Sequence, residues 1–253
     1  MIYDLQRASM WKRISAWLLD AILLCIVTTL MAFLLSTALN YDSYSQQLDA
    51  RYAHFEAEYG VSRELTQDQV DAMTPEQLAN LDAASLALSE DEEALYAYNM
   101  MIHLMIVITS IGILLAYIVL EFTVPAVLGN GQTVGKRIFG IGVMRQDGVR
   151  VNGVCMFIRT VLGKYAIETM IPVLMTLMLF FGTFGLVGWL IVAAIAIAQI
   201  VLLATTKERC TIHDKLANTV TVDVASQMIF KTHDDMIAYK QKVAAEKAAN
   251  QVY

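Results

Sequence analysis

Residues 11–20 read Trp11-Lys12-Arg13-Ile14-Ser15-Ala16-Trp17-Leu18-Leu19-Asp20, and they open an apolar run that continues to Leu39. The run Ile14–Leu39 is long enough to cross a bilayer, because a transmembrane helix needs about 20 predominantly apolar residues. A cleavable signal peptide is the competing interpretation. The apolar stretch is too long for a signal peptide, and Asp20 interrupts the part that should be most apolar. We therefore predict a retained transmembrane helix.

Two charged residues of this helix, Arg13 and Asp20, point to a functional site. They are nearly two helical turns apart, so they share one face at a separation of about 10 Å along the axis. Ala16 lies between them and allows a neighbouring backbone to approach. A charge inside a span is costly and usually faces protein or water, which makes both residues candidates for function. The alternative is structural, with Arg13 reaching the headgroups and Asp20 satisfying a contact between helices.

The composition identifies a membrane protein. Hydrophobic residues make up 57% of the 253-residue chain and its mean hydropathy is +0.52, which is well above that of an ordinary soluble domain. The three cysteines are far apart in the sequence and form neither a CxxC pair nor a cluster with histidine. We therefore expect no disulfide, no structural metal and no cofactor. We also expect no nucleic-acid partner.

Three further spans follow the first. The second is predicted at Met100–Leu120. The apolar stretch Tyr165–Ala204 is too long for one span and suits two, joined by a tight turn at residues 182–185. Before them, residues 154–164 carry Arg159 on an otherwise apolar helix, which favours a segment lying at the headgroups. The chain is therefore predicted to have four transmembrane helices.

Residues 40–98 form an acidic insert between the first two spans. They contain thirteen acidic residues and two basic ones. Three capping-box patterns predict helix starts, at Thr66 with Gln69, Thr74 with Gln77, and Ser89 with Glu92. We expect two or three short helices, the last of which runs into the second span. The acidic run at residues 90–93 either attracts cations or is a solvated helix start favoured by the helix dipole.

A small β-hairpin is predicted between the second and third spans. Ile141–Arg145 and Val149–Asn152 alternate apolar and polar residues, and Asp147-Gly148 between them is a strong turn signal. Another strand-like segment, Thr219–Val224, follows the fourth span. The residues after it are rich in alanine, lysine and glutamine, so they are predicted to form a polar helix or a frayed end.

Four more ionisable residues lie in or beside the predicted spans and are secondary site candidates: His103, Glu121, Arg159 and Glu168. His103 lies one turn inside the second span, and Glu121 marks its far end. A histidine in this place either relays protons or lies at the interface. Glu168 lies near the start of the third span.

The basic residues set the predicted orientation. Three lie before Ile14, six lie in residues 121–164 and seven follow Ala204, whereas residues 40–98 hold two. Four spans place the three basic segments on one side, so that sixteen basic residues stand against two. We therefore expect both termini in the cytoplasm and the insert outside.

The predicted fold is an all-α membrane protein with four transmembrane helices, an acidic helical extracytoplasmic insert and a small cytoplasmic β-hairpin. The predicted parts are a lead with the first helix at 1–39, the insert at 40–98, the remaining membrane domain at 99–224 and a cytoplasmic tail at 225–253. The lipid bilayer is the partner that this composition implies.

Several separated motifs resemble the RDD family of prokaryotic membrane proteins. They are Arg13 and Asp20, the stretch Gln132-Thr133-Val134-Gly135-Lys136-Arg137-Ile138-Phe139-Gly140-Ile141-Gly142-Val143-Met144, Asp147-Gly148, and His213-Asp214-Lys215-Leu216-Ala217-Asn218-Thr219. The family is named for one arginine and two aspartates, which the resemblance places at Arg13, Asp20 and Asp214. The resemblance covers residues 8–39 and 99–224. The insert departs from it, as does Asn218, which stands where a small residue, often glycine, is usual in the family. The resemblance implies a multi-pass protein of the prokaryotic inner membrane, the plasma membrane.

Two functions remain open. Cation/proton antiport has been proposed for RDD members, so the resemblance implies a transporter that exchanges monovalent cations for protons. In this hypothesis Asp20 exchanges a proton for a cation, Arg13 tunes the pKa of Asp20, and Asp214 gates the cytoplasmic face. Four spans are few for a transport path, so we expect a homo-oligomer.

In the alternative hypothesis the chain is a non-catalytic membrane scaffold or assembly factor, and the three charges hold the helix bundle together. Under either hypothesis we predict that Asp214 approaches Arg13 and that Arg13 lies between Asp20 and Asp214 as their shared partner. The sequence shows no nucleophile with a base, so we expect no enzymatic activity.

The predicted topology can be tested by cysteine labelling in a variant that lacks the three native cysteines. A membrane-impermeant reagent added outside intact cells should label Ser62→Cys and leave Ser226→Cys unmodified. Both positions should react once the cells are permeabilised, which is the control. Labelling of both positions in intact cells, or of Ser226→Cys alone, would contradict the four-span orientation.

Overall fold

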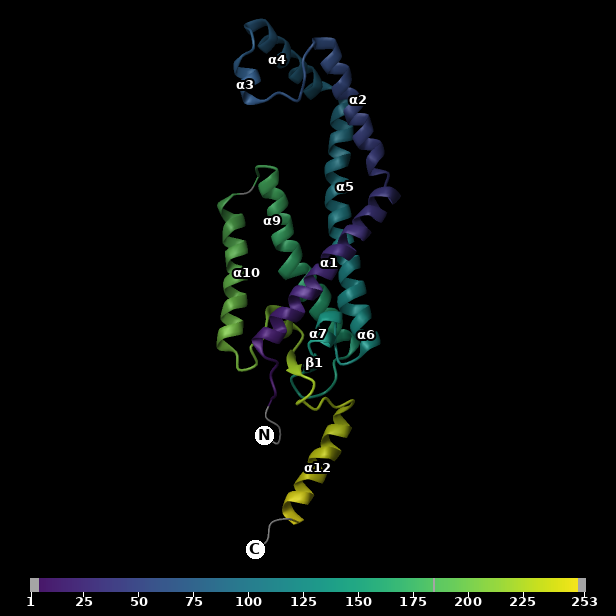
Figure 1. The fold of residues 1–253 in the computed structure, drawn as a ribbon, viewed down its shortest axis with the longest axis vertical. Coiled ribbons are helices and arrows are strands. Elements are labelled where there is room, and N and C mark those ends of the chain that lie inside the picture. The colour runs from purple at the N-terminus through teal and green to yellow at the C-terminus, as the bar shows by residue number, and fades with distance from the viewer. Residues whose placement is uncertain (1–4, 184, 250–253) are drawn as a thin grey trace. The chain divides into compact units, whose positions relative to one another are not determined.

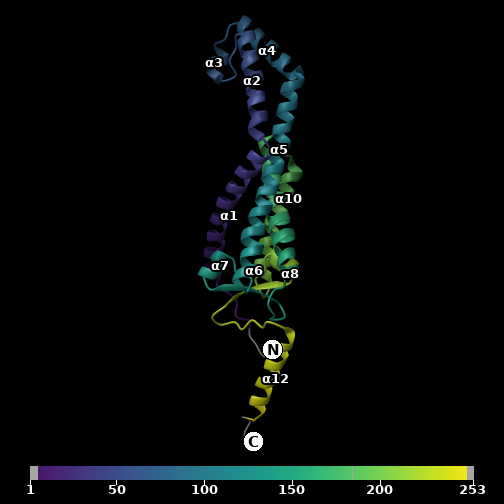
Figure 2. The same ribbon diagram turned by 90° about the vertical axis from the view of Figure 1, so that its right-hand side faces the viewer.

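The computed structural model describes residues 5–183 and 185–249, and these residues are mostly helical (Figures 1 and 2). The chain divides into two compact units. One unit contains residues 1–28 and 113–253, and the other contains residues 29–112. Both borders fall inside long helices, so each unit includes part of α1 (Met10–Ala38) and part of α5 (Glu92–Tyr117).

Four helices in the described part of the chain are long and apolar enough to cross a membrane. Their ranges are Met10–Ala38, Glu92–Leu128, Gly153–Phe180 and Leu186–Thr205. They confirm the four predicted spans, although the second extends beyond Met100–Leu120 at both ends. Their length and composition make the chain a multi-pass membrane protein.

The last two spans lie side by side and are joined by a short turn (Figure 1). The helix α9 (Ile171–Phe180) ends just before the turn and α10 (Leu186–Thr205) begins just after it, as predicted. Gly182 adopts a φ of 68°, a left-handed conformation that glycine adopts without steric cost. Phe184, which belongs to the predicted turn, lies outside the described residues.

Two π-helical segments contact each other inside the first unit. The segment η1 covers Ile118–Thr123 and is followed by α6 (Val124–Leu128), whereas η2 covers Ile158–Met170 and follows α8 (Gly153–Phe157). Thr160 Oγ1 donates a hydrogen bond to the carbonyl oxygen of Glu121 at 3.0 Å. π-Helical turns occur often at functional sites, and these two carry ionisable residues of both spans.

The predicted headgroup segment at residues 154–164 is not a separate element. These residues begin the continuous helix Gly153–Phe180, and the whole helix is a candidate span. Arg159, which suggested an interfacial position, is only 2% exposed. Its partners lie more than fifty residues further along the chain, so the local pattern of charge did not reveal its burial.

The first unit contains an antiparallel sheet of two strands, β1 (Ile141–Arg145) and β2 (Thr219–Asp223). Val143 pairs with Thr221 in the centre of the register. Met144, Val220 and Val222 form a small buried core beside the sheet. The strand-like segment predicted at Thr219–Val224 is therefore confirmed, and it pairs with the first predicted strand, a pairing that the sequence did not indicate.

The predicted hairpin is wrong in its second strand. The Asp147-Gly148 turn forms, because Arg145 N donates to the Val149 carbonyl oxygen at 2.9 Å. Beyond the turn, Arg150 makes an isolated bridge to Met144. The chain then leaves the sheet, because the Asn152 side chain caps α8 by accepting a hydrogen bond from Cys155 N at 2.8 Å.

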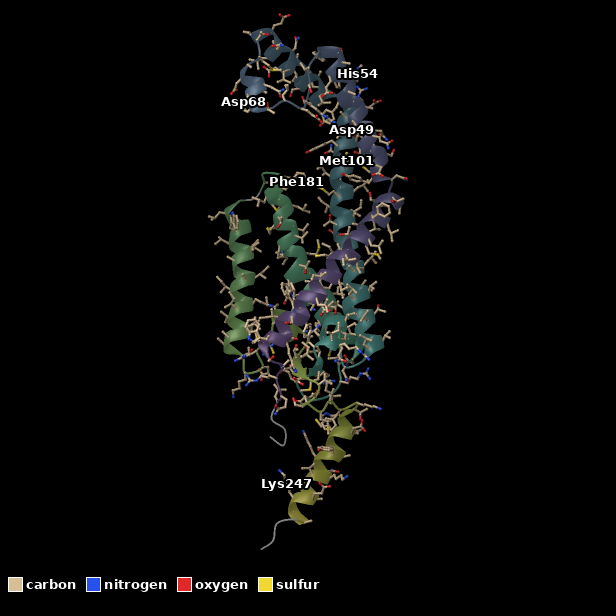
Figure 3. The ribbon with its side chains drawn as sticks, in the orientation of Figure 1. Asp49, His54, Asp68, Met101, Phe181 and Lys247 are labelled. Atoms are coloured by element: carbon tan, nitrogen blue, oxygen red, sulfur yellow. The ribbon has the colours of Figure 1, made fainter. Side chains whose placement is uncertain are left out.

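The second unit contains the acidic insert. Its helices are α2 (Tyr41–Tyr59), α3 (Gln67–Asp71) and α4 (Pro75–Glu90). Figure 3 labels Asp49 and His54 on α2 and Asp68 on α3. Leu48 of α2 is buried with Ala94 and Ala97 from the first turns of α5, so the insert has a hydrophobic core of its own.

Two of the three predicted helix starts in the insert are confirmed. Complete capping boxes form at Thr66 and at Thr74. The third is wrong, because α4 continues through Ser89 and the next helix is capped by Asp91. The Asp91 carboxylate accepts from Ala94 N at 2.7 Å, and Arg51 of α2 also donates to it. Since these bonds stabilise its charged form, the backbone donor and then Arg51 lower the pKa of Asp91.

Two short helices and the C-terminal helix complete the first unit. They are α7 (Val134–Ile138), α11 (Ile212–Leu216) and α12 (His233–Ala249). α12 confirms the polar helix that was predicted after β2. Its Met236 side chain is buried. α7 and α11 hold side chains that meet at the ends of the spans.

Candidate functional site

The carboxylate of Asp20 is held by α7. Thr133 Oγ1 donates to Asp20 Oδ2 at 2.5 Å, and the Gly135 amide donates to Asp20 Oδ1 at 2.8 Å. A Cβ added to Gly135 would lie 2.3 Å from the carbonyl oxygen of Ala16, so this contact requires glycine. The close approach of a backbone at Ala16 confirms the prediction made for that residue.

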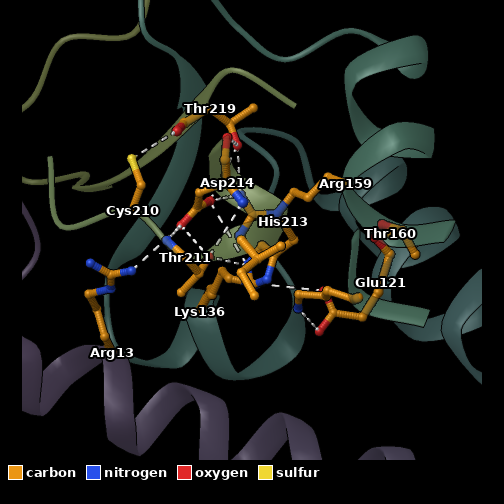
Figure 4. Close-up of polar contacts among 12 residues, drawn as sticks. Arg13, Glu121, Lys136, Arg159, Thr160, Cys210, Thr211, His213, Asp214 and Thr219 are labelled. Carbon is orange, nitrogen blue, oxygen red and sulfur yellow. Dashed lines mark hydrogen bonds and ion pairs between the residues drawn. The ribbon is translucent and has the colours of Figure 1, made fainter. Parts of the chain in front are cut away.

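The carboxylate of Asp214 is held by two arginines (Figure 4). Arg159 of η2 donates directly to Asp214 Oδ1, and Arg13 of α1 lies 3.6 Å from Asp214 Oδ2. Thr211 caps α11 and donates to the same carboxylate at 2.8 Å. Arg159 also donates to Thr219 Oγ1 at 2.9 Å, which connects the network to β2.

Asp214 is 1% exposed, and this burial has the largest single effect on the pKa of its carboxyl group. Burial alone would raise the pKa of Asp214, but the cation of Arg159, helped by that of Arg13, outweighs burial and lowers that pKa below its ordinary value. Asp214 is therefore a charged, buried anion at neutral pH.

The predicted approach of Asp214 to Arg13 is confirmed, but Arg13 is not the shared partner of both aspartates. Besides contacting Asp214, Arg13 donates to the carbonyl oxygen of Arg209 at 2.7 Å. Asp20 instead takes its donors from Thr133 and Gly135. Sequence spacing placed both aspartates near one face but carried no information on the donors that α7 supplies.

Glu121 forms a second buried cluster with two lysines. Lys164 Nζ lies 2.5 Å from Glu121 Oε1, and Lys136 Nζ lies 3.7 Å from Glu121 Oε2. Lys136 Nζ also donates to Thr133 Oγ1 at 3.4 Å. Burial lowers the pKa of Lys136 to about 8, since Glu121 offsets only part of that effect while Lys164 and Arg159 add to it.

Glu168 pairs with the imidazole of His213. Nδ1 of His213 lies 2.8 Å from Glu168 Oε2, and the His213 amide donates to Glu168 Oε1 at 3.0 Å. Gly163 allows this packing, because a Cβ there would lie 2.5 Å from His213 Cβ. Burial, then the Arg159 cation, lowers the pKa of His213 against the opposing effect of Asp214 and Glu168. His213 is therefore neutral at pH 7.

A cavity of about 250 Å³ opens among these clusters, and we call it the charged cavity. Apolar side chains of α1 and α10, including Ile14, Trp17 and Leu203, form part of its wall. Its ionisable lining consists of four cationic residues, three carboxylates and His213; the charged residues are Arg13, Lys136, Arg159, Lys164, Asp20, Glu121 and Asp214. With His213 neutral, the cationic residues exceed the carboxylates by one.

The structure brings together most of the predicted site residues. Arg13, Asp20 and Asp214 line the charged cavity, as do Glu121 and Arg159, while Glu168 contacts the lining residue His213. His103 belongs to the other unit, where its Nδ1 lies 2.7 Å from the carbonyl oxygen of Asn99. Whether His103 relays protons stays a prediction.

Sequence reasoning missed the roles of Thr133, Lys136, Lys164 and His213. Thr133 and Lys136 stand in the Gln132–Gly140 motif, and His213 precedes Asp214 in another motif, so the motifs marked their neighbourhoods. Lys164 had no signal beyond being a charge on an apolar helix. The partners of all four are distant in sequence, and no local pattern identified them.

A family model for the RDD family matches residues 7–218. The match includes all the charged residues of the cavity and ends just before β2. No curated protein and no solved structure matches the chain. Asn218 adopts a φ of 52°. Asparagine tolerates this left-handed conformation better than most residues.

The buried Arg159–Asp214 pair should dominate the stability of the first unit. Arg159→Met leaves Asp214 buried with only the more distant Arg13, so the free energy of unfolding should fall by about 3–5 kcal/mol. Equilibrium unfolding in mixed detergent micelles measures this change. Adding Asp214→Leu to Arg159→Met should recover part of the loss, because the unpaired charge is removed.

Lys12→Met is the matched control for Arg159→Met. Lys12 Nζ lies 2.5 Å from Asp223, but its side chain is 44% exposed. Such a surface pair contributes about 0–1 kcal/mol. An Arg159→Met variant no less stable than Lys12→Met would show that the Arg159–Asp214 pair does not hold this unit together.

Proposed function

The chain belongs to the RDD family, and from that premise we propose that it is a small transporter that exchanges a monovalent cation for a proton in the charged cavity. Asp20 is the carboxylate that binds the cation. Arg13 and Asp214 have different tasks from those inferred by resemblance, because they pair with each other and stabilise the wall of the cavity.

The environment of Asp20 is the observation that carries this proposal. Asp214 is paired with arginines and Glu121 with lysines. The hydrogen bonds to Asp20 in the described part of the chain come from a hydroxyl and a backbone amide, which are neutral donors. No arginine or lysine side chain of the described residues forms an ion pair with Asp20, so its carboxylate is available to a cation.

The charge at Asp20 suits a monovalent cation. A divalent cation such as calcium prefers several carboxylate and carbonyl oxygens. The other two carboxylates of the charged cavity are already engaged by cationic side chains, so Asp20 offers a single negative charge. The threonine and glycine of α7 fix the orientation of its carboxylate from the side opposite the helix α1 that carries it.

We extend the proposal to a homodimer in the membrane. Four spans give few surfaces with which to enclose a path across the bilayer. A second copy would supply the missing wall beside α1 and α10, whose apolar side chains are exposed.

A non-catalytic scaffold or assembly factor is the second candidate. The observation that favours it is the full set of partners of the Asp214 carboxylate. Two arginines and the hydroxyl and backbone amide of Thr211 hold it in place, as expected for a structural charge. The separate hydrophobic core of the insert also suits a partner-binding module. The two candidates differ in what they require of Asp20.

Asp20→Asn separates the two functions, because asparagine keeps the shape and hydrogen bonding of the side chain and removes its charge. In proteoliposomes the variant should lose cation-driven proton flux by about tenfold or more, which corresponds to the loss of about 1.4 kcal/mol of cation binding. Flux should be measured with sodium, potassium and lithium. Size-exclusion profiles and thermal midpoints establish that the variant is folded.

Asp235→Asn is the control, because Asp235 is an exposed carboxylate at the start of α12. Its flux should match that of the unmodified protein. If Asp20→Asn supports unchanged flux, the Asp20 carboxylate is structural and the exchange proposal is wrong.

A further inference from the structure

A continuous line of polar contacts leads from Asp20 to Lys136. Asp20 Oδ2 accepts from Thr133 Oγ1 at 2.5 Å, and the same hydroxyl oxygen accepts from Lys136 Nζ at 3.4 Å. Lys136 Nζ lies 3.7 Å from Glu121 Oε2, and Glu121 pairs more closely with Lys164. One hydroxyl group therefore separates the proposed cation site from a buried lysine.

Lys136 is the cationic group of the charged cavity that is least firmly held as a cation. Arg13 and Arg159 are guanidinium groups, which stay protonated. Lys164 has a carboxylate oxygen at 2.5 Å, whereas the nearest one to Lys136 is at 3.7 Å. Lys136 is nevertheless buried, so its positive charge is poorly solvated.

The count of charges in the charged cavity also points to Lys136 as the group whose charge can change. Among the residues that line the charged cavity, four cations face three carboxylates, so the lining loses its excess positive charge when Lys136 is neutral; Glu168 lies behind His213, outside the lining. A monovalent cation bound at Asp20 would restore the single positive charge. The cavity thus holds the same total charge with a proton on Lys136 or with a cation beside Asp20.

We propose that Lys136 carries the proton that is exchanged for the cation. This inference rests on the proposed function and assigns the second half of its exchange. The Nζ–H bond of the Lys136 ammonium breaks, the proton passes to water in the cavity, and the neutral amine keeps the electron pair. The cation then binds beside Asp20, and return of the proton to Lys136 expels it by electrostatic repulsion across Thr133.

The charged groups around Lys136 support this assignment. It faces Asp20 from α1, Glu121 from η1, and Arg159 and Lys164 from η2. Burial and the two cations favour the neutral amine, and the two carboxylates favour the ammonium. Their balance places the pKa of Lys136 at about 8, so a modest change of charge at Asp20 can add or remove its proton near neutral pH.

Two substitutions should move cation binding in opposite directions. In Lys136→Met the cavity lacks the competing charge, so the apparent affinity for sodium should rise and become independent of pH. In Lys136→Arg the charge is permanent, so the affinity should fall about tenfold or more and also lose its pH dependence. In the unmodified protein the affinity should rise about tenfold per pH unit below pH 8 and level off above it.

Sodium-dependent uptake into proteoliposomes at a series of pH values provides the readout, with Lys215→Met as the matched control. Lys215 lies on α11 close to the network, but its side chain is exposed. The control should keep the pH dependence of the unmodified protein. Because one charge replaces another, the exchange should also be insensitive to an imposed membrane potential.

The outcomes separate this inference from the proposed function. If Asp20→Asn abolishes uptake while both Lys136 variants keep the ordinary pH dependence, transport stands and the proton is carried elsewhere, which overturns this inference. If the unmodified protein takes up no monovalent cation, both proposals fail. Opposite shifts of affinity in Lys136→Met and Lys136→Arg, with the pH dependence lost in both, support the inference.

Discussion

The first unit depends on one buried ion pair, between Arg159 and Asp214. Arg159 stands in the π-helical part of the third span, and Asp214 completes the capping box of the short helix α11 after the fourth span. Arg159 also reaches Thr219, the first residue of β2, and Asp214 reaches Arg13 near the start of α1. Because an unpaired charge in this buried place is costly, the pair fixes the ends of these spans and the sheet relative to one another.

That fixed framework leaves the three carboxylates of the charged cavity in different environments. Asp214 is bound by arginines and stays ionised. Glu121 is held by Lys164 and shares its remaining oxygen with Lys136. Asp20 accepts its hydrogen bonds, among the residues that the structure describes, from neutral donors. This difference explains how one cavity can contain both structural charges and a cation-binding group. Asp214 and Glu121 hold the surrounding helices in place through their ion pairs, whereas Asp20 is available to a cation from solution.

The features that sequence predicted well are those coded by neighbouring residues. Apolar length located the four spans, and capping boxes located the helix starts at Thr66 and Thr74. The predicted hairpin was wrong in its second strand because the local turn signal at Asp147-Gly148 carries no information on a competing strand more than seventy residues away. The helix start predicted at Ser89 was wrong because the Ser89 hydroxyl donates to the Leu86 carbonyl oxygen within α4, while Asp91 caps the next helix.

The site residues show the same difference between features coded locally and features that depend on distant residues. Motif residues located Arg13, Asp20 and Asp214, but the partners of Asp20 and the position of Lys136 depend on how α7 packs against α1, which no spacing within either segment encodes. The two π-helical segments were likewise invisible, since their sequences differ little from those of ordinary apolar helices. The role of a charged residue in a transmembrane helix can therefore be inferred only when the side chains that pack against it are known.

Proton release on cation binding tests the exchange most directly. The purified protein in detergent would be titrated with sodium at neutral pH in two buffers of different ionisation enthalpy. The difference in heat between the buffers gives the number of protons released. Release of about one proton per bound cation is expected, because Lys136 is protonated below pH 8 and loses its proton when Asp20 is occupied. Cation binding with the same heat in both buffers would contradict the exchange.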